Sequence, residues 1–209
     1  MPKPAAIAKT ALALTAALLC ASCIGVDEKI TINADGSGQL DLVYRISTMV
    51  SDIGPSAGQP HPIPLPMTED AFRSAVAAVN GLTLSKLSSQ LTPSDLVISS
   101  VVAFTDPTLL SLIGQGASAP RITFSTTGGR TTFRETIYQG NPGGVDPDTL
   151  SFIKSAFQGY LLRFTLSAPF RITGVNVGTI SQDQRTAVYT TNVVDAIQSK
   201  SPLVWEVRW

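Results

Sequence analysis

The sequence predicts an α+β fold, in which a mainly antiparallel sheet of about nine strands carries about four short helices packed on one face. The first observation behind this prediction is a series of short segments in which apolar and polar residues alternate, from residues 30–46 to residues 202–209. The second is a set of helix starts between these segments, at Thr68, Asp106, Asp146 and Asn192. Strands and helices therefore occur in one mixed domain.

The first strands are predicted to form a hairpin. Ile30 and Ile32 alternate with polar residues, Asp35-Gly36 follows, and the alternation resumes from Leu40 to Ile46. Asp-Gly between two alternating segments favours a tight turn. The alternative, a calcium loop that begins at Asp35, lacks the spaced carboxylates and closing Glu of an EF-hand. We interpret the segment as a turn.

Residues 54–66 contain five prolines, which exclude a helix and predict a long extended surface loop. Thr68 then begins a helix that ends before Gly81. Strands are predicted at residues 82–90 and 95–104. The second strand is apolar on both faces, which indicates a central position in its sheet.

A weak internal repeat follows. Asp106-Pro107 and Asp146-Pro147 each place a capping carboxylate before a proline, the preferred start of a helix. Each predicted helix leads into a strand, at residues 121–125 and 163–167. Common origin and independent convergence on good capping chemistry both explain this pattern, and both predict the same architecture.

The remaining elements are also predicted from local patterns. Gly128-Gly129 lies between two strand-like segments and predicts a second tight hairpin. Strands are expected at residues 170–177 and 185–191, a short helix at 192–199, and a half-buried final strand at 202–209.

Residues 1–22 have the features of a secretory signal peptide. Lys3 and Lys9 precede a short apolar stretch at residues 10–19, which is too short to span a bilayer. Small residues, Ala21 and Ser22, stand directly before Cys23, as in a lipobox. We expect cleavage after residue 22 and acylation of Cys23, which leaves residues 23–209 as a single extracytoplasmic α+β domain. An ordinary cleaved signal is the alternative.

Acylation of Cys23 and loss of Cys20 would leave no free thiol in the mature chain. Two or three acyl chains anchor a protein stably, whereas one chain binds only marginally. Ile24 follows Cys23 in place of the Asp that resembles an inner-membrane retention signal. We therefore expect a lipid anchor in the bacterial cell envelope, in the outer membrane where there are two membranes. A net charge near −2 for residues 23–209, without a basic run, argues against nucleic acid as a partner.

Several runs resemble a family of spirochaete-type bacterial lipoproteins of unassigned function: Gly25-Val26-Asp27, Ile30-Thr31-Ile32-Asn33, Asp35-Gly36-Ser37-Gly38 and Trp205-Glu206-Val207-Arg208-Trp209. The N-terminal hairpin is more loosely similar to lipoproteins of the LppM type, which are associated with lipid binding. The resemblance implies a location and a fold. It supplies no catalytic residues and no cofactor.

Candidates for catalysis are few. Gly54, Ser56 and Gly58 match a nucleophile-elbow pattern, and His61 lies just beyond it. A true elbow lies between a buried strand and a helix, with the acid and the His later in the chain, whereas this one precedes a Pro-rich segment. Ser56 and His61 are therefore weak candidates. No cofactor and no metal are predicted, because capping explains Asp146 and Asp148, the carboxylates best placed to chelate a cation.

A carboxylate pair is a second catalytic possibility. Asp41, Glu135 and Glu206 are candidates, although no spacing singles them out. Glu135 lies between Phe133 and Ile137 on a face that should be buried. We interpret it as a structural residue satisfied by an edge position or by a cation such as Arg163.

The leading functional hypothesis is a membrane-anchored, non-catalytic binding module for a lipid or other hydrophobic ligand, or for an envelope protein. The anchor, the 44% hydrophobic content and the long Pro-rich loop support it. The alternatives are a lipid-directed hydrolase of phospholipase or esterase type, which would use Ser56 with His61, and a purely structural envelope lipoprotein.

Overall fold

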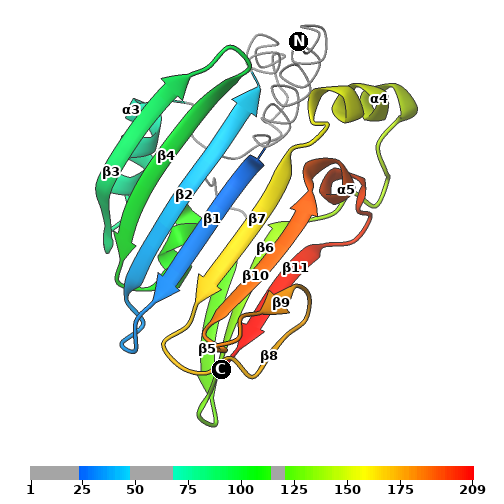
Figure 1. Ribbon diagram of the computed structural model, residues 1–209. Helices are drawn as coiled ribbons and strands as arrows, with labels where there is room; N and C mark the ends of the chain where they lie inside the picture. The colour runs from blue at the N-terminus through cyan, green and yellow to red at the C-terminus, as the bar shows by residue number, and fades with distance from the viewer. Residues whose placement is uncertain (1–23, 48–67, 114–120) are drawn as a thin grey trace, which may run out of the picture.

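The computed structural model describes residues 24–47, 68–113 and 121–209, which form two sheets and four short helices. The first sheet has seven strands in the order β3-β4-β2-β1-β7-β10-β9, and the second has four in the order β5-β6-β11-β8 (Figure 1). The fold class is therefore the predicted one, but the expectation of one sheet of about nine strands is wrong. Local alternation predicts a strand without indicating which sheet it joins.

The seven-stranded sheet is built on the N-terminal hairpin. Its strands are β1 (Ile24–Ile32), β2 (Gly38–Ser47), β3 (Leu82–Leu91), β4 (Asp95–Phe104), β7 (Leu161–Ser167), β9 (Thr179–Ile180) and β10 (Thr186–Asn192). β4 lies between β3 and β2, which confirms its predicted central position. Among the described residues, the pairing of β1 with β7 is the one parallel contact, and every other strand pair is antiparallel.

The four-stranded sheet consists of β5 (Ile122–Thr127), β6 (Arg130–Tyr138), β8 (Gly174–Val175) and β11 (Leu203–Arg208). The predicted long strand at residues 170–177 is reduced to the two residues of β8, and Phe170 is 57% exposed. β8 pairs with only Val207 and Arg208 of β11, at the edge of the sheet. Alternation at an edge with so few partners does not sustain a full strand.

Both predicted hairpin turns are confirmed. Asp35 accepts hydrogen bonds from the backbone N–H (3.0 Å) and hydroxyl (2.7 Å) of Ser37, as a turn residue does, and Gly36 has a φ of 87°. Gly128 and Gly129, between β5 and β6, have φ values of 59° and 76°. A two-residue turn with two positive φ values matches the right-handed twist of the strands, and glycine adopts it without steric cost.

The helices begin at the four predicted positions, three of them with a capping side chain and the fourth, at Asn192, without a side-chain cap hydrogen bond. They are α3 (Glu69–Ala77), the 3₁₀ helix η1 (Pro107–Leu112), α4 (Pro147–Ala156) and α5 (Val193–Gln198). The side chains of Thr68, Asp106 and Asp146 each accept a hydrogen bond from a backbone N–H in the first turn. η1 is tighter than the expected α-helix. Its Ser111 hydroxyl accepts from the N–H of Ile122 (2.7 Å) and lies 3.3 Å from the carbonyl of the same residue, so it joins η1 to β5.

One face of the seven-stranded sheet is covered by two different layers. α3 packs against β3, and its Phe72 ring stacks on Tyr44 of β2 at 6.4 Å. The four-stranded sheet lies behind β7 and β10 (Figure 1). α3 therefore shares this face with a second sheet, which differs from the expected all-helical cover. The two units of the sequence repeat also diverge, because η1 leads into the smaller sheet and α4 into the larger.

Several predictions fall on residues outside the described part of the chain. They concern the signal peptide at residues 1–22, Cys23, the Pro-rich loop at 54–66, and Ser56 with His61. Within the described residues, every helix is too short or too polar to cross a bilayer.

Candidate functional site

The space between the two layers contains a cavity of about 200 Å³. Its wall is mostly apolar, with three charged residues, Glu28, Arg45 and Arg121, among those that line it. The seven-stranded sheet contributes one side, through Val26 and Glu28 of β1 and the facing residues of the neighbouring strands, Leu40, Leu42, Leu162 and Phe164.

Strand alternation explains which residues face the cavity. Glu28 is opposite Leu42 on one neighbouring strand and Phe164 on the other, so the three side chains share one face of the sheet. Val26, two residues earlier, is next to Leu162 on the same face. The intervening Asp27 points to the other face, where its carboxylate is 3.7 Å from the guanidinium of Arg163.

The opposite wall is assembled from separate elements. η1 supplies Leu110, the residue after it is Ile113, and β6 ends in Ile137 and Tyr138. α5 supplies three small or aliphatic side chains, Val193, Ala196 and Ile197. These residues come from three separate parts of the sequence, so no local sequence motif predicts the cavity.

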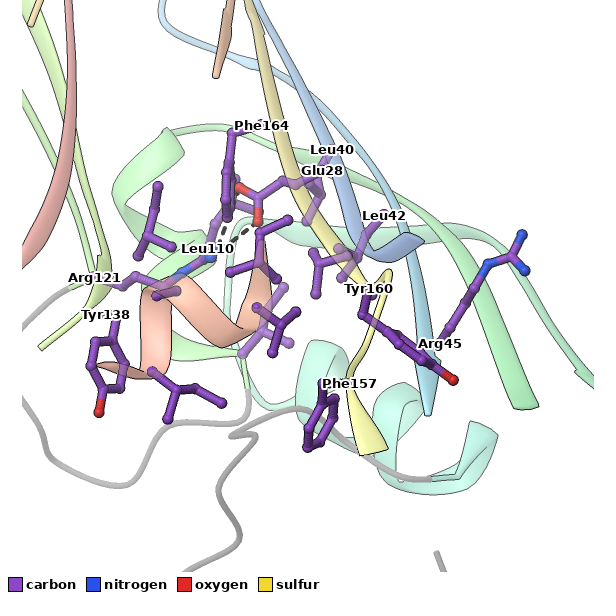
Figure 2. Close-up of a pocket in the computed structure, with 18 residues that line it drawn as sticks. Glu28, Leu40, Leu42, Arg45, Leu110, Arg121, Tyr138, Phe157, Tyr160 and Phe164 are labelled. Carbon is purple, nitrogen blue, oxygen red and sulfur yellow. Dashed lines mark hydrogen bonds and ion pairs between the residues drawn. The ribbon is translucent and has the colours of Figure 1, made fainter. Parts of the chain in front are cut away.

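Two aromatic residues border the cavity where β7 begins. Phe157, at the C-terminus of α4, meets Tyr160 edge-on with ring centroids 5.9 Å apart. The Tyr160 hydroxyl donates a hydrogen bond to the buried carboxylate of Asp95, at the start of β4. Figure 2 shows Phe157 and Tyr160 well apart from a second feature, the pair formed by Glu28 and Arg121.

That second feature is a buried ion cluster. Arg121 Nη1 is 3.0 Å from Glu28 Oε2 and 2.8 Å from Glu135 Oε1. The cluster joins the two sheets, because Glu28 belongs to β1 and Glu135 to β6. Both carboxylate side chains are almost wholly buried, at 3% and 0% exposure, and that of Arg121 is 26% exposed.

The cluster holds two acids and one base, so its charges do not balance when all three are ionised. Burial, and then the charge of Glu28, raise the pKa of Glu135 to about 8, against the opposing attraction of Arg121. Burial disfavours the charge on Arg121, but Glu28 and Glu135 outweigh it and raise the Arg121 pKa. A pKa raised in this way favours the protonated form of Glu135 at neutral pH, beside the Glu28–Arg121 contact of 3.0 Å.

The structure changes the interpretation of the acidic candidates. Glu135 is buried as expected, but its cation is Arg121 and not Arg163, which pairs with Asp27 on the far face. Its carboxylate neighbour Glu28 had no predicted role. The sequence does contain a sign that Glu28 is buried. It lies two residues from Val26 and two from Ile30 on one strand, so its side chain points to the same face as these two apolar residues.

The other acidic candidates do not join this cluster. Asp41 lies on the opposite face of β2 from Leu40 and Leu42, and its carboxylate accepts from the Gln39 amide. Glu206 lies on the opposite face of β11 from Trp205 and pairs with Arg208. In the part of the chain that the structure describes, no group of three or more His, Cys, Asp or Glu residues is placed to hold a metal ion.

Fold and cavity together define an α+β domain of two packed sheets with an apolar interior cavity.

No protein-family model matches the chain, and no curated protein matches it. Among solved structures, it is similar to the folded domain of LppM from Mycobacterium tuberculosis, determined by NMR. The identity is 12%, the TM-score is 0.48, and the match covers 88% of this chain and 86% of that one. These values are too low to assign a family or a function.

Proposed function

We propose that this protein is a membrane-anchored, non-catalytic module of the bacterial cell envelope that holds a hydrophobic chain in its interior cavity. The observation that carries the proposal is the cavity itself, of about 200 Å³, walled by aliphatic and aromatic side chains. Cys23 is the proposed anchor, and the outer membrane is the proposed location. Residues 23–209 form the proposed mature domain.

The volume limits the class of ligand. An apolar cavity of about 150 Å³ accepts a benzene-sized molecule, and pockets for drug-sized ligands begin at roughly 300 Å³. A cavity of about 200 Å³ is therefore suited to one hydrocarbon segment, such as part of a single acyl chain, and not to a whole two-chain lipid.

The charges around the cavity support the same class of ligand, a hydrocarbon segment. The raised pKa of Glu135 lowers the negative charge of the cluster at neutral pH, and the guanidinium of Arg121 is already bonded to Glu28 and Glu135. An anionic group beside it would face Glu28 and lose its own hydration. The polar end of the ligand is better placed outside the cavity, in contact with water.

The experiment is native mass spectrometry with lipid extraction on residues 24–209, expressed without the signal and compared with an Ala196→Phe variant. Ala196 is 4% exposed and lines the cavity from α5, so a phenyl ring there would occupy the ligand space. We expect the parent chain to carry bound acyl lipid, or to bind added fatty acid. We expect the variant to lose that binding by at least tenfold.

The matched control is Ala77→Phe, at an exposed position at the end of α3, which should bind as the parent does. Folding of the Ala196→Phe variant is checked by urea unfolding. A ring added to a filled core costs about 1–3 kcal/mol, whereas a ring added to a real cavity does not. A bare mass with no binding of added lipid would contradict the proposal and leave docking of an envelope protein or a structural role. Acyl-ester hydrolysis lost in a Ser56→Ala variant would instead favour the hydrolase.

A further inference from the structure

The two ends of the seven-stranded sheet differ in which strands begin there. β1, β4 and β7 run in the same direction, because β1 is parallel to β7 and antiparallel to β2, which is antiparallel to β4. Their first residues therefore lie at one end of the sheet. The two hairpin turns, at Asn33–Ser37 and Gly128-Gly129, lie at the opposite end (Figure 1).

The cavity lies toward the end where these three strands begin. Gly25 and Val26 at the start of β1 line it, and so do Tyr160 and Leu162 at the start of β7. The Glu28–Arg121–Glu135 cluster lies deeper. On the far side of the cluster from the strand starts the interior is filled, and the ring centroids of Trp205 and Phe133 are 6.2 Å apart.

The proposed anchor is attached at that same end without a linker. Pairing of β1 with β7 starts at Ile24 opposite Leu161, so the residue directly after Cys23 is already part of the sheet. Gly25 is so closely packed that a Cβ there would lie 3.2 Å from Val193 Cγ2 and 3.3 Å from the Leu161 carbonyl. Gly25, the second residue after the proposed anchor, also lines the cavity.

We propose that this end of the domain, defined by the starts of β1, β4 and β7, lies against the bilayer, so that an acyl chain passes between membrane and cavity without crossing water. The inference rests on the proposed function and adds an orientation and a partner, the lipid surface. The evidence for this orientation is the direction of the strands. Exposed apolar side chains do not distinguish the two ends, because Leu91 at this end and Phe170 at the other are both more than half exposed.

The test measures the orientation directly, on the full lipoprotein reconstituted in phosphatidylcholine vesicles. A fluorophore is attached to Gln158→Cys, next to the start of β7, or to Gln182→Cys, in the turn before β10. Both glutamines are exposed, and they lie at opposite ends of the sheet, since β10 begins opposite the last residue of β7. Headgroup nitroxide lipids then act as quenchers.

We expect the label at position 158 to be quenched several-fold more than the label at position 182. Equal quenching, the reverse order, or failure of the full chain to stay on the vesicles would overturn the inference. Quenching needs no ligand. A cavity that binds nothing would therefore defeat the proposed function and leave the orientation result intact.

A tether variant tests the consequence for ligand exchange. A Gly/Ser segment of 20 residues inserted between Cys23 and Ile24 lets the domain move roughly 25 Å from its anchor. We expect transfer of a fluorescent fatty acid from vesicle to protein to slow at least tenfold, while equilibrium binding by the detached domain stays unchanged. Unchanged transfer would show that the chain reaches the cavity through water.

Discussion

The interior between the two sheets has a filled end and a hollow end, and both are built from the same strands. At the filled end, the Trp205 ring lies between the rings of Phe133 and Phe164, with centroid distances of 6.2 Å and 6.4 Å, and Leu166 is fully buried. At the hollow end, Leu162 of the same strand as Leu166 borders a cavity of about 200 Å³. The difference comes from the facing layer and not from β7.

Side-chain size in that facing layer accounts for the contrast. β11 and β6 present indole and phenyl rings to the larger sheet at the filled end. At the hollow end, α5 presents the small side chain of Ala196, with Val193 and Ile197, in place of the rings of β6 and β11. Smaller side chains in the facing layer leave space that no neighbouring ring fills. The same apolar pattern thus produces a filled core in one place and a cavity in another.

The ion cluster separates the two ends, and removing its cation should have the largest effect on the contrast. We expect Arg121→Met to lower the free energy of unfolding by about 3–5 kcal/mol, because the buried carboxyl groups of Glu28 and Glu135 would lose the cation that both contact. Urea unfolding at pH 7 measures the loss.

Arg163→Met is the matched control. Its pair with Asp27 is 3.7 Å long and partly exposed on both sides, so its loss should cost less than about 1 kcal/mol. A triple variant with Arg121→Met, Glu28→Gln and Glu135→Gln should recover much of the stability. Equal losses for the two arginine variants would show that the cluster is not buried in solution.

A second prediction compares two leucines of β7 directly. We expect Leu166→Ala to cost about 2–5 kcal/mol, as for a leucine in a filled core. Leu162→Ala should cost no more than about 2 kcal/mol, because Leu162 borders existing space and fewer contacts are lost. Both values come from urea unfolding of the ligand-free domain. Equal costs would mean that the hollow end closes in solution.

Features set by neighbouring residues were predicted well. The caps at Thr68, Asp106 and Asp146 and the Gly128-Gly129 turn follow from hydrogen bonding and backbone sterics within a few residues. The central position of residues 95–104 follows from apolar residues on both faces.

Features set by distant residues were not predicted. Division into two sheets depends on which strands pair, and each strand has the same local pattern in either sheet. Glu28 stands in the polar run Asp27-Glu28-Lys29, where its inward direction becomes visible only once Val26 and Ile30 are placed on one face. Arg121 lies 93 residues from Glu28 in the sequence, and no spacing rule connects them. The cavity has no local motif for the same reason.

The last prediction concerns the pH dependence of the cluster. Unfolded Glu135 loses its proton near pH 4.5, whereas in the folded chain burial and Glu28 raise its pKa to about 8. The folded state therefore holds one more proton between these values, and the free energy of unfolding falls as pH rises through this window. The slope from one proton is at most about 1.4 kcal/mol per pH unit and falls to half of that at the folded pKa, so the loss between pH 6 and pH 8 is about 2 kcal/mol.

Glu135→Gln should remove this slope, because the amide cannot ionise. Glu206→Gln is the control, since that carboxylate lies on the other face of β11 and pairs with Arg208. If Glu135→Gln and the parent lose stability in parallel from pH 6 to pH 8, Glu135 is already ionised at neutral pH. The cavity wall would then carry a net negative charge, and an acyl chain with a cationic end would fit it better than a neutral one.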